Sequence, residues 1–324
     1  MGNIPQKILI VKPSSMGDIV HGLLIAESIR KQLPDANIDW VVRREFAPLV
    51  DSANAINKTY IFKRDGGISA FIKLLKEVRR ETYDIALDMQ GLARSAIITK
   101  AAHAGLKIGR PDAREGAGLS YHKTTAMPTG KEPCHAVEIL TGFLTALELE
   151  PTLPKSVSFS PPKDEIELIP MHGQGKRLLL FPESRRAEKN WLGYEALTRE
   201  LLRVDGIHEV IWCGHIPFEA GQAIIHPRFR NLCGQTNIGQ LSLLMQRSDC
   251  IVSNDSGPMH LAAALDRPLV TLFGPTDPRR FGPFPSAPEQ QRIIRREDGN
   301  LGSITVEEVH QAILDVLRTS VDSD

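Results

Sequence analysis

The sequence lacks the usual marks of a metal protein, a secreted protein or a nucleic-acid-binding protein. Only four cysteines occur in 324 residues, and they show neither metal-site spacing nor a paired framework. A reduced cytoplasmic environment is the simplest interpretation of them. Basic and acidic residues balance at 39 each, so the charge indicates no nucleic-acid partner.

Two further absences concern membranes and cofactors. There is no run of about 18 apolar residues, so we expect no transmembrane segment. The N-terminus leads straight into a predicted strand and lacks a signal peptide. The G-x-G-x-x-G pattern is missing after that strand, which disfavours a nicotinamide-dependent oxidoreductase, and no other cofactor is indicated.

The chain does contain two series of strands alternating with helices, separated by a proline-rich stretch at 150–170. In the first half the pattern predicts strands at 7–12, 37–42, 59–62 and 84–88, and helices at 19–32, 71–80, from about 92, and at 135–147. In the second half it predicts strands at 177–181, 210–213, 250–252 and 268–273, and helices at 194–204, 221–225, 238–246, from about 259, and at 305–317. Such alternation predicts an α/β fold with a parallel sheet in each half. We therefore expect domains at 1–155 and 172–324 with a linker at 156–171, and the last helix could pack back on the first domain.

The stretch from Val252 to Ala264 is a candidate anion site. Asp255-Ser256-Gly257-Pro258 predicts a turn that opens a helix, because Asp or Ser suits the cap and Pro the first turn. The unpaired N–H groups of such a helix start can hold a phosphate, and His260 could add a donor. The plainer alternative is an ordinary capped helix that binds nothing.

Polar and charged residues also follow other predicted strands. Ser184, Arg185, Arg186 and Lys189 come after the strand at 177–181, where a diphosphate would satisfy them, although a solvated loop is equally consistent. In the first half, ligands are expected where strands end. The residues that fall there are Ser14, Ser15, Asp18, Asp88, Gln90 and Arg94. Asp18 could equally be a simple helix cap.

Residues 94–131 form a basic segment. It holds seven Lys or Arg against Asp112 and Glu115, so 7 − 2 = +5. A solvated surface and a docking face for an anionic acceptor are both consistent with this charge.

Together these motifs resemble the ADP-heptose:lipopolysaccharide heptosyltransferases of glycosyltransferase family 9, and they look most like heptosyltransferase I. The resemblance runs in order through nearly the whole chain. Its motifs are Val11-Lys12-Pro13-Ser14-Ser15-Met16-Gly17-Asp18-Ile19-Val20-His21, Asp88-Met89-Gln90-Gly91-Leu92, Lys189-Asn190-Trp191, Asn254-Asp255-Ser256-Gly257-Pro258-Met259-His260 and Phe273-Gly274-Pro275-Thr276-Asp277.

The resemblance implies a GT-B fold, in which two Rossmann-like domains face each other across a cleft. The first domain would bind the acceptor and the second the nucleotide sugar, in an inverting reaction without an obligatory metal. Asp18 matches the position of the family's proposed base. Stabilisation of the departing diphosphate would fall to Lys189, Ser256, Gly257 and His260, with Lys12 helping from across the cleft. The D-x-D triplet of metal-dependent enzymes occurs only at 322–324, in the polar tail.

The remaining site residues also follow from the resemblance. Ser184, Arg185, Asp255 and Glu219 would complete the donor site, with Glu219 on the ribose. Ser184-Arg185 departs from the two threonines of the enterobacterial members. Ser14, Ser15, Gln90, Arg94, Arg114, Lys63 and Arg64 are the candidates for acceptor binding.

The implied partners are an ADP-sugar and an anionic lipid-linked glycolipid of the Kdo-lipid A type. The protein would be cytoplasmic and peripheral, in transient contact with the inner membrane. One alternative is a relative with another sugar or acceptor, such as a heptosyltransferase II-like enzyme. Another is a non-catalytic nucleotide-sugar or glycan-binding protein of the same fold, which the presence of both Asp18 and Lys189 disfavours.

Overall fold

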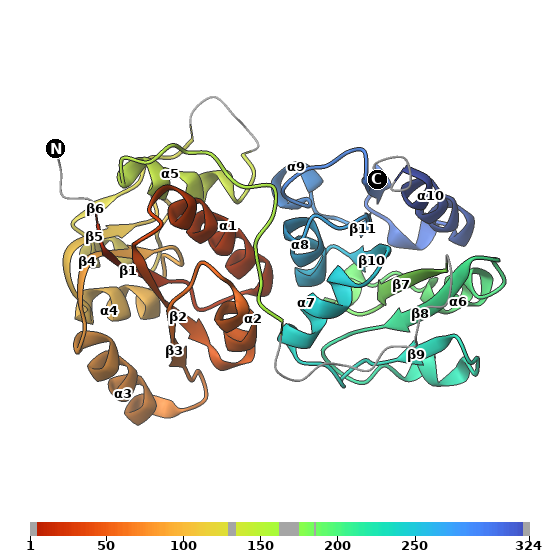
Figure 1. Cartoon of the computed structure of the whole chain (residues 1–324), viewed down its shortest axis with the longest axis horizontal. Helices are drawn as coiled ribbons and strands as arrows, with labels where there is room; N and C mark the ends of the chain where they lie inside the picture. The colour runs from red at the N-terminus through yellow and green to blue at the C-terminus, as the bar shows by residue number, and fades with distance from the viewer. Residues whose placement is uncertain (1–4, 129–133, 162–174, 185, 320–324) are drawn as a thin grey trace. The chain divides into compact units, whose positions relative to one another are not determined.

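The computed structural model describes residues 5–128, 134–161, 175–184 and 186–319. The chain divides into two compact units, Met1–Ser160 and Pro161–Asp324 (Figure 1). The first unit extends past residue 155, because Phe159 pairs with Ala53 and the Ser160 N–H donates to the Ser52 carbonyl at 2.7 Å. Most of the linker expected at 156–171 lies outside the described residues.

The first unit is built on a six-stranded parallel sheet with the order β3-β2-β1-β4-β5-β6. Its strands are β1 (Lys7–Val11), β2 (Asn37–Arg43), β3 (Lys58–Phe62), β4 (Thr82–Asp88), β5 (His103–Gly109) and β6 (Lys123–Thr124). From Ile8 to Val11 the central strand β1 is fully buried. Burial on both faces explains why its sequence is apolar without alternation.

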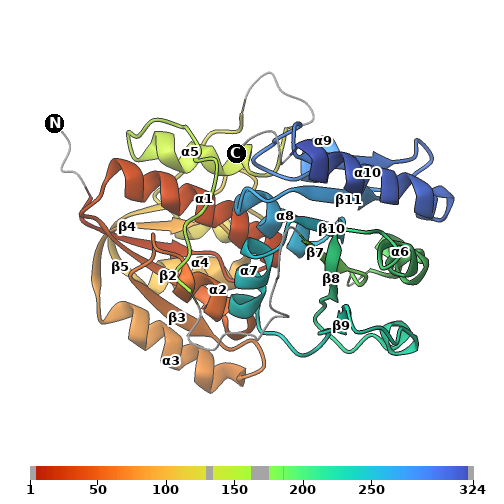
Figure 2. The same cartoon turned by 45° about the vertical axis from the view of Figure 1, so that its right-hand side comes forward.

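Helices cover both faces of this sheet. They are α1 (Met16–Gln32), α2 (Ala47–Ser52), α3 (Gly67–Arg79), α4 (Ala93–Ala101) and α5 (Glu138–Ala146), with short 3₁₀ turns η1 (Arg44–Phe46) and η2 (Ala117–Ser120). The chain adds strands toward one edge of the sheet from β1 to β3 and toward the other edge from β3 to β6. Because each crossover is right-handed, α1 and α2 lie on one face and α3 and α4 on the other. In Figures 1 and 2, α5 lies beside α1, and α3 lies away from both. On the α3 face, α4 packs against both α3 and η2.

The second unit repeats this plan. Its parallel sheet has the order β12-β11-β10-β7-β8-β9. The strands are β7 (Lys176–Phe181), β8 (Ile207–Trp212), β9 (Phe229–Asn231), β10 (Cys250–Asn254), β11 (Leu269–Phe273) and β12 (Gln291–Arg295). Its helices are α6 (Tyr194–Leu201), α7 (Ile238–Gln246), α8 (Gly257–Ala264), α9 (Pro278–Phe281) and α10 (Val306–Thr319), with 3₁₀ turns η3 (Ala187–Lys189), η4 (Glu219–Ala223) and η5 (Leu301–Ser303).

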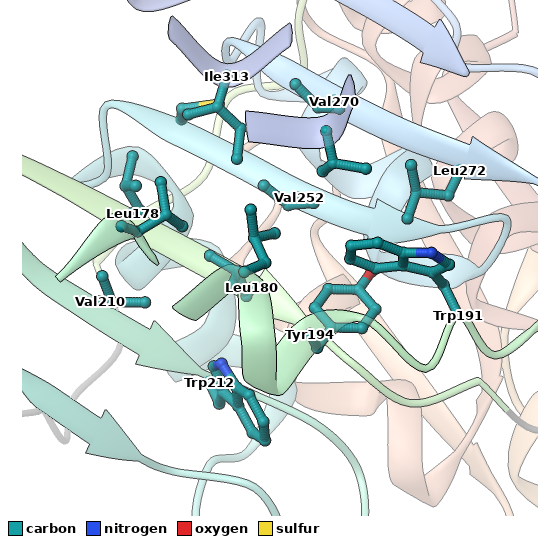
Figure 3. Close-up of a cluster of buried hydrophobic side chains, with 14 of the residues drawn as sticks. Leu178, Leu180, Trp191, Tyr194, Val210, Trp212, Val252, Val270, Leu272 and Ile313 are labelled. Carbon is teal, nitrogen blue, oxygen red and sulfur yellow. The ribbon is translucent and has the colours of Figure 1, made fainter. Parts of the chain in front are cut away.

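One hydrophobic cluster holds this second unit together (Figure 3). The inward side chains of β7, β8, β10 and β11 meet Trp191, Tyr194 and the apolar side of α10. The final helix packs against α6, β10, β11 and β12 through residues that include Val309, Ile313 and Val316. The apolar side of α10 is therefore buried within its own unit.

Numbered within each unit, both sheets have the strand order 3-2-1-4-5-6 of the doubly wound Rossmann fold. This confirms the prediction of two Rossmann-like α/β units. The predicted strands and long helices are present, but three helices begin earlier than expected. Helix α3 starts at Gly67, four residues before its predicted start. Helix α1 starts at Met16 after Ser15 as N-cap, and α8 starts at Gly257 after Ser256.

Four strands were not predicted. β5 and β6 lie in the basic segment 94–131, and β9 and β12 lie in the second unit. β5 carries two glycines and a lysine, β9 has three residues and β6 has two. Such short or polar strands have no continuous apolar run to reveal them.

No helix in the described part of the chain is both long enough and apolar enough to cross a bilayer.

Candidate functional site

In doubly wound sheets, ligands bind beyond the carboxyl ends of the strands, where neighbouring strands send their next helices to opposite faces. In the first unit this switch point lies between β1 and β4, and in the second between β7 and β10. A lysine–aspartate pair lies at each switch point, after β1 in the first unit and after β7 and β10 in the second. Each switch point is therefore a candidate functional site of its own unit.

The first pair joins Lys12, directly after β1, to Asp18 in the first turn of α1. Lys12 Nζ lies 3.3 Å from Asp18 Oδ1. The lysine side chain is only 1% exposed, whereas that of the aspartate is 43% exposed. The ammonium is thus buried behind a carboxylate that faces solvent. This places Lys12 as the partner of Asp18, although the sequence had suggested a donor contact for it.

Ser15 fixes the other side of the Asp18 carboxylate. Asp18 Oδ2 accepts the Ser15 N–H at 3.1 Å and the Ser15 hydroxyl at 2.8 Å. Asp18 is therefore not the N-cap; it occupies the third helical position and completes a capping box with Ser15. One carboxylate oxygen of Asp18 thus binds the helix start and the other binds the lysine.

Burial and the mutual charges of the two groups set the pKa values of this pair. Partial burial opposes the ionisation of Asp18, but the nearby ammonium and the Ser15 hydrogen bonds hold the pKa of Asp18 well below its usual range. Burial lowers the pKa of Lys12, and the Asp18 charge partly offsets this. Asp18 is consequently ionised at neutral pH and able to accept a proton.

A second buried carboxylate, Asp88, shapes the neighbouring loop after β4. Asp88 accepts the N–H groups of Gln90 and Gly91, both at 2.9 Å, and the Tyr121 hydroxyl at 2.8 Å. Gln90 Oε1 in turn accepts the Ser14 N–H at 3.3 Å, so the loops after β1 and β4 are joined. Because Asp88 is fully enclosed, it holds this loop in place and does not itself face a ligand.

The other predicted acceptor residues lie at several places in the first unit. Arg94 and Arg114 are exposed, and the Arg114 N–H donates to the Gly91 carbonyl at 2.9 Å, close to the Asp88 loop. Lys63 and Arg64 follow the edge strand β3, which is two strands away from β1, or roughly 10 Å in the plane of the sheet. Lys63 lines a groove of about 600 Å³ between β3 and α3.

The described cations of the basic segment 94–131 are spread over several elements. Arg94 opens α4, whereas Lys100 lies near its other end, about 9 Å further along the helix axis. Lys107 Nζ donates to the Lys100 carbonyl at 2.9 Å. Arg110 is bound by Asp112 through two hydrogen bonds, at 2.7 and 2.8 Å.

The second pair joins Lys189, in the loop after β7, to Asp255, directly after β10. Lys189 Nζ lies 2.5 Å from Asp255 Oδ2, and the Thr276 hydroxyl donates to the same oxygen. Here the lysine side chain is 15% exposed and the aspartate side chain 5%. The carboxylate is buried and its lysine is the more exposed partner, the reverse of the first unit.

The loop that carries Lys189 is anchored on both sides. The buried Trp191 donates through Nε1 to the Ile304 carbonyl at 2.9 Å, and its ring lies edge-on to Tyr194 at 5.3 Å (Figure 3). Asn254, at the end of β10, accepts the Trp191 N–H at 3.3 Å and donates to the Phe181 and Pro182 carbonyls, both at 3.3 Å. Asn254 therefore joins the two loops of this switch point.

Helix α8 begins beside this pair. Ser256 is its N-cap and Pro258 lies in its first turn, as the sequence predicted. Gly257 opens the helix, and His260 is largely buried one turn in. The first N–H groups of any helix have no partner within it and carry a partial positive charge, so this start suits an anion.

Two predicted donor residues cannot be placed. Arg185 lies outside the described residues, as does the side chain of Glu219. Ser184 is described: its N–H donates to Asn190 Oδ1 at 2.7 Å, and its hydroxyl to the Arg186 carbonyl at 2.8 Å. These bonds hold the turn in which Lys189 stands.

Sequence reasoning did not single out several residues that build the two switch points. They are Tyr121, Asn190, Asn254 and Thr276. Asn190, Asn254 and Thr276 stand inside the motifs quoted for the resemblance, so a role was detectable there. Tyr121 had a weaker signal, because its partner Asp88 is distant in sequence.

Two Rossmann-like units in one chain, one presenting a carboxylate and the other a lysine beside a helix start, are the parts of a GT-B glycosyltransferase. The profile of glycosyltransferase family 9 (heptosyltransferase) matches residues 71–307, and the chain belongs to that family. It is an enzyme of the glycosyltransferase class, as the motifs indicated.

Named relatives agree with this assignment. The chain is 29% identical to lipopolysaccharide heptosyltransferase 1 of Escherichia coli K12, covering 97% of this chain and 100% of the relative. It is 26% identical to lipopolysaccharide heptosyltransferase 2 of Salmonella typhimurium, covering 96% and 95%. Among solved structures, E. coli heptosyltransferase WaaC with ADP matches at a TM-score of 0.77 and 25% identity, covering 96% and 99%.

Proposed function

We propose that this enzyme transfers heptose from ADP-heptose to the Kdo of the lipopolysaccharide inner core, with inversion at the anomeric carbon. One observation carries the proposal: the first unit presents an ionised carboxylate, Asp18, with a buried lysine behind it. The names of the relatives supply the sugar and the pathway, and the ADP in the matched solved structure supplies the nucleotide.

Asp18 acts as the general base. The acceptor hydroxyl donates a hydrogen bond to the exposed carboxylate, loses its proton to it and attacks the anomeric carbon of the donor. Lys12 keeps the carboxylate ionised before the reaction, and the capping box with Ser15 fixes its direction. Gln90 in the loop after β4, Arg94 in the first turn of α4 and Arg114 in the loop after β5 hold the anionic acceptor.

The second unit binds the donor and stabilises its leaving group. As the bond from the anomeric carbon to the diphosphate breaks, negative charge grows on the ADP oxygens. Lys189 offers a charged donor and α8 offers its first N–H groups and the His260 imidazole. Asp255 and Thr276 hold the lysine in place.

The proposed acceptor is lipid-linked, so the enzyme works at the cytoplasmic side of the inner membrane through surface contact. The test is an incubation of the purified protein with ADP-heptose or other nucleotide sugars, and with Kdo-lipid A or an already heptosylated acceptor. We expect a single heptose added to Kdo-lipid A, detected by mass spectrometry, and at least about 100-fold slower addition with the Asp18→Asn variant.

The main alternative is transfer to an inner core that already carries heptose, as in heptosyltransferase 2, to which the chain is also similar. Product only from the heptosylated acceptor would favour it. No product from any donor and acceptor, with ADP still bound, would favour a non-catalytic binding protein.

A further inference from the structure

Two neighbouring helices of the first unit expose apolar side chains that the core does not need. Ile68 and Ile72 on α3 are 80% and 46% exposed, and Ile97 on α4 is also exposed. The inner side of α3 is already filled, because Leu74 and Val78 lie in the core and Phe71 packs against it. The exposed isoleucines therefore add nothing to the packing of the unit.

The same surface is basic. In sequence, α3 and α4 contain five cations and one carboxylate, and that carboxylate, Glu77, is already 3.9 Å from Lys73. Within the described part of the chain, Lys76, Arg79, Arg94 and Lys100 have no ion-pair partner, and all four are exposed. We call this surface the basic–apolar face; it comprises Ile68, Ile72, Lys73, Lys76, Arg79, Arg94, Ile97 and Lys100.

Its residues are ordered along the helix. Ile68, Ile72, Lys76 and Arg79 follow one another at intervals of four, four and three residues, so they form a single stripe on the outside of α3. The final helix of the second unit shows the contrast. The described residues of α10 expose Glu307, Gln311 and Arg318 and no large apolar side chain.

We propose that the basic–apolar face binds the surface of a membrane that contains anionic phospholipid. A helix with isoleucines bordered by lysine and arginine lies in the interface, with its apolar side chains among the acyl chains and its cations on the phosphates. Charge complementarity selects this occupant. The phosphates of anionic lipids match the unpaired cations, and the acyl chains match the exposed isoleucines, whereas a purely apolar partner would leave the cations without a counter-charge. The inference rests on the proposed function, since a lipid-linked acceptor requires such contact.

The position of the face suits that acceptor. Helices α3 and α4 begin just after the carboxyl ends of β3 and β4, the edge of the sheet on which Asp18 lies. Ile68 and Arg94 occupy the first turns of these helices, close to that edge. Figures 1 and 2 show α3 along the outside of its unit, with no helix of that unit over its outer side. A lipid anchored there would keep its sugar near the first switch point.

The test compares two double variants with matched controls on the second unit. Ile68→Ser/Ile72→Ser removes the apolar part, and Lys76→Glu/Arg79→Glu reverses two charges. Ile225→Ser/Ile293→Ser and Arg203→Glu/Arg318→Glu make the same changes at exposed positions elsewhere. None of these residues belongs to the proposed catalytic or binding machinery. Binding is measured by co-sedimentation with vesicles of phosphatidylethanolamine and phosphatidylglycerol, and with vesicles of phosphatidylcholine alone.

We expect the full chain to bind the anionic vesicles, and each face variant to bind about tenfold less or weaker still, with the controls unchanged. Turnover of a deacylated, water-soluble acceptor should be the same in all five proteins. Equal binding of wild type and face variants, or equal binding to phosphatidylcholine, would overturn the inference. So would a loss of turnover on the soluble acceptor in the face variants, which would indicate a folding role.

The two proposals fail differently. If the wild type transfers heptose to the soluble acceptor but does not sediment with anionic vesicles, the membrane face is wrong and the function stands. If it sediments and the face variants do not, but it transfers nothing to any acceptor, the proposed function fails and the membrane-binding face stands.

Discussion

The two Rossmann units carry the same charged pair in opposite senses. Each places a lysine after its first strand and holds it against an aspartate. In the first unit the lysine is buried and the carboxylate faces solvent, whereas in the second the carboxylate is buried and the lysine is the more exposed partner. In the first pair the buried lysine keeps the exposed carboxylate ionised, and in the second the buried carboxylate holds the more exposed lysine in place. One fold thus presents a carboxylate at one switch point and a lysine at the other.

The pairs also differ in how far apart their members lie in sequence. Lys12 and Asp18 are six residues apart, within one strand-to-helix connection. Lys189 and Asp255 are 66 residues apart and meet only because β7 and β10 are neighbours. The first pair can therefore form within one local connection, while the second forms only when β7 and β10 have paired in the sheet.

Removing the exposed carboxylate of the first pair should have the largest effect. Asp18→Asn keeps the shape and the contact with Ser15 but removes the proton acceptor, so we expect kcat to fall by about 10²–10⁴-fold. ADP affinity, measured by calorimetric titration, should not change. The substitution also leaves Lys12 buried without a counter-charge, so Lys12→Met/Asp18→Asn should regain thermal stability without regaining activity. Turnover within about threefold of wild type would reduce Asp18 to a helix-capping residue.

Removing the exposed lysine of the second pair should come next. Lys189→Ala deletes a charge-assisted contact with the diphosphate, worth about 1.5–3 kcal/mol, or roughly 10–150-fold in the Kd for ADP. Calorimetric titration measures this loss. Because Lys189→Ala leaves the buried Asp255 carboxylate without its cation, Lys189→Ala/Asp255→Asn serves as the control that separates lost stability from lost ADP binding. An unchanged Kd would exclude Lys189 from the donor site.

The buried lysine of the first pair should control pH dependence. Lys12 lowers the pKa of Asp18, so Lys12→Met should raise it and move the acid limb of kcat/KM to higher pH, by about one unit if half of a strong ion pair is lost. The lowered pKa of Asp18 also makes folding stability depend on pH. Ionised Asp18 stabilises the fold above about pH 3.9, and this contribution is lost as pH falls through its folded pKa. An acid limb at the same pH in wild type and Lys12→Met would contradict the effect of Lys12 on the pKa of Asp18.

Thr276 should have the smallest effect. Thr276→Val removes the hydroxyl that donates to Asp255 and keeps the volume, so the lysine loses one constraint. We expect a several-fold weaker ADP affinity, about 1 kcal/mol. The matched control is Thr305→Val, at a threonine in the turn before α10 whose hydroxyl accepts the Glu308 N–H. Equal small losses in both variants would mean that Thr276 contributes only to folding.

The sequence predicted the fold well where burial leaves a strong pattern. The buried strands β1, β4, β7, β10 and β11 read as apolar runs, and helix α7 was predicted at its observed bounds of Ile238–Gln246. Strands β5, β6, β9 and β12 were missed because they are short or polar. Their pairing is decided by neighbours distant in sequence, which local patterns do not contain.

The site was predictable to a similar degree. Strand ends identified Asp18, Lys189 and Asp255, because in a parallel sheet all strand ends meet at one edge. The direction of burial could not be predicted, since nothing in the sequence tells which member of a lysine–aspartate pair will face solvent. The sequence therefore left open whether Asp18 is a helix cap or a base, and the donor contact expected for Lys12 stays a prediction.

Asn254 has a consequence for the thermodynamics of donor binding. Its side chain already links the loop after β7 to the end of β10 through hydrogen bonds to three backbone groups. The Lys189 loop is therefore held before any nucleotide arrives, and little conformational entropy remains to be lost on binding. The heat-capacity change on ADP binding should then match the burial of the nucleotide and its contacts alone, without the larger value that accompanies the folding of a loop. In Asn254→Ala, ordering of the loop would become part of the binding reaction, and the heat-capacity change should become more negative.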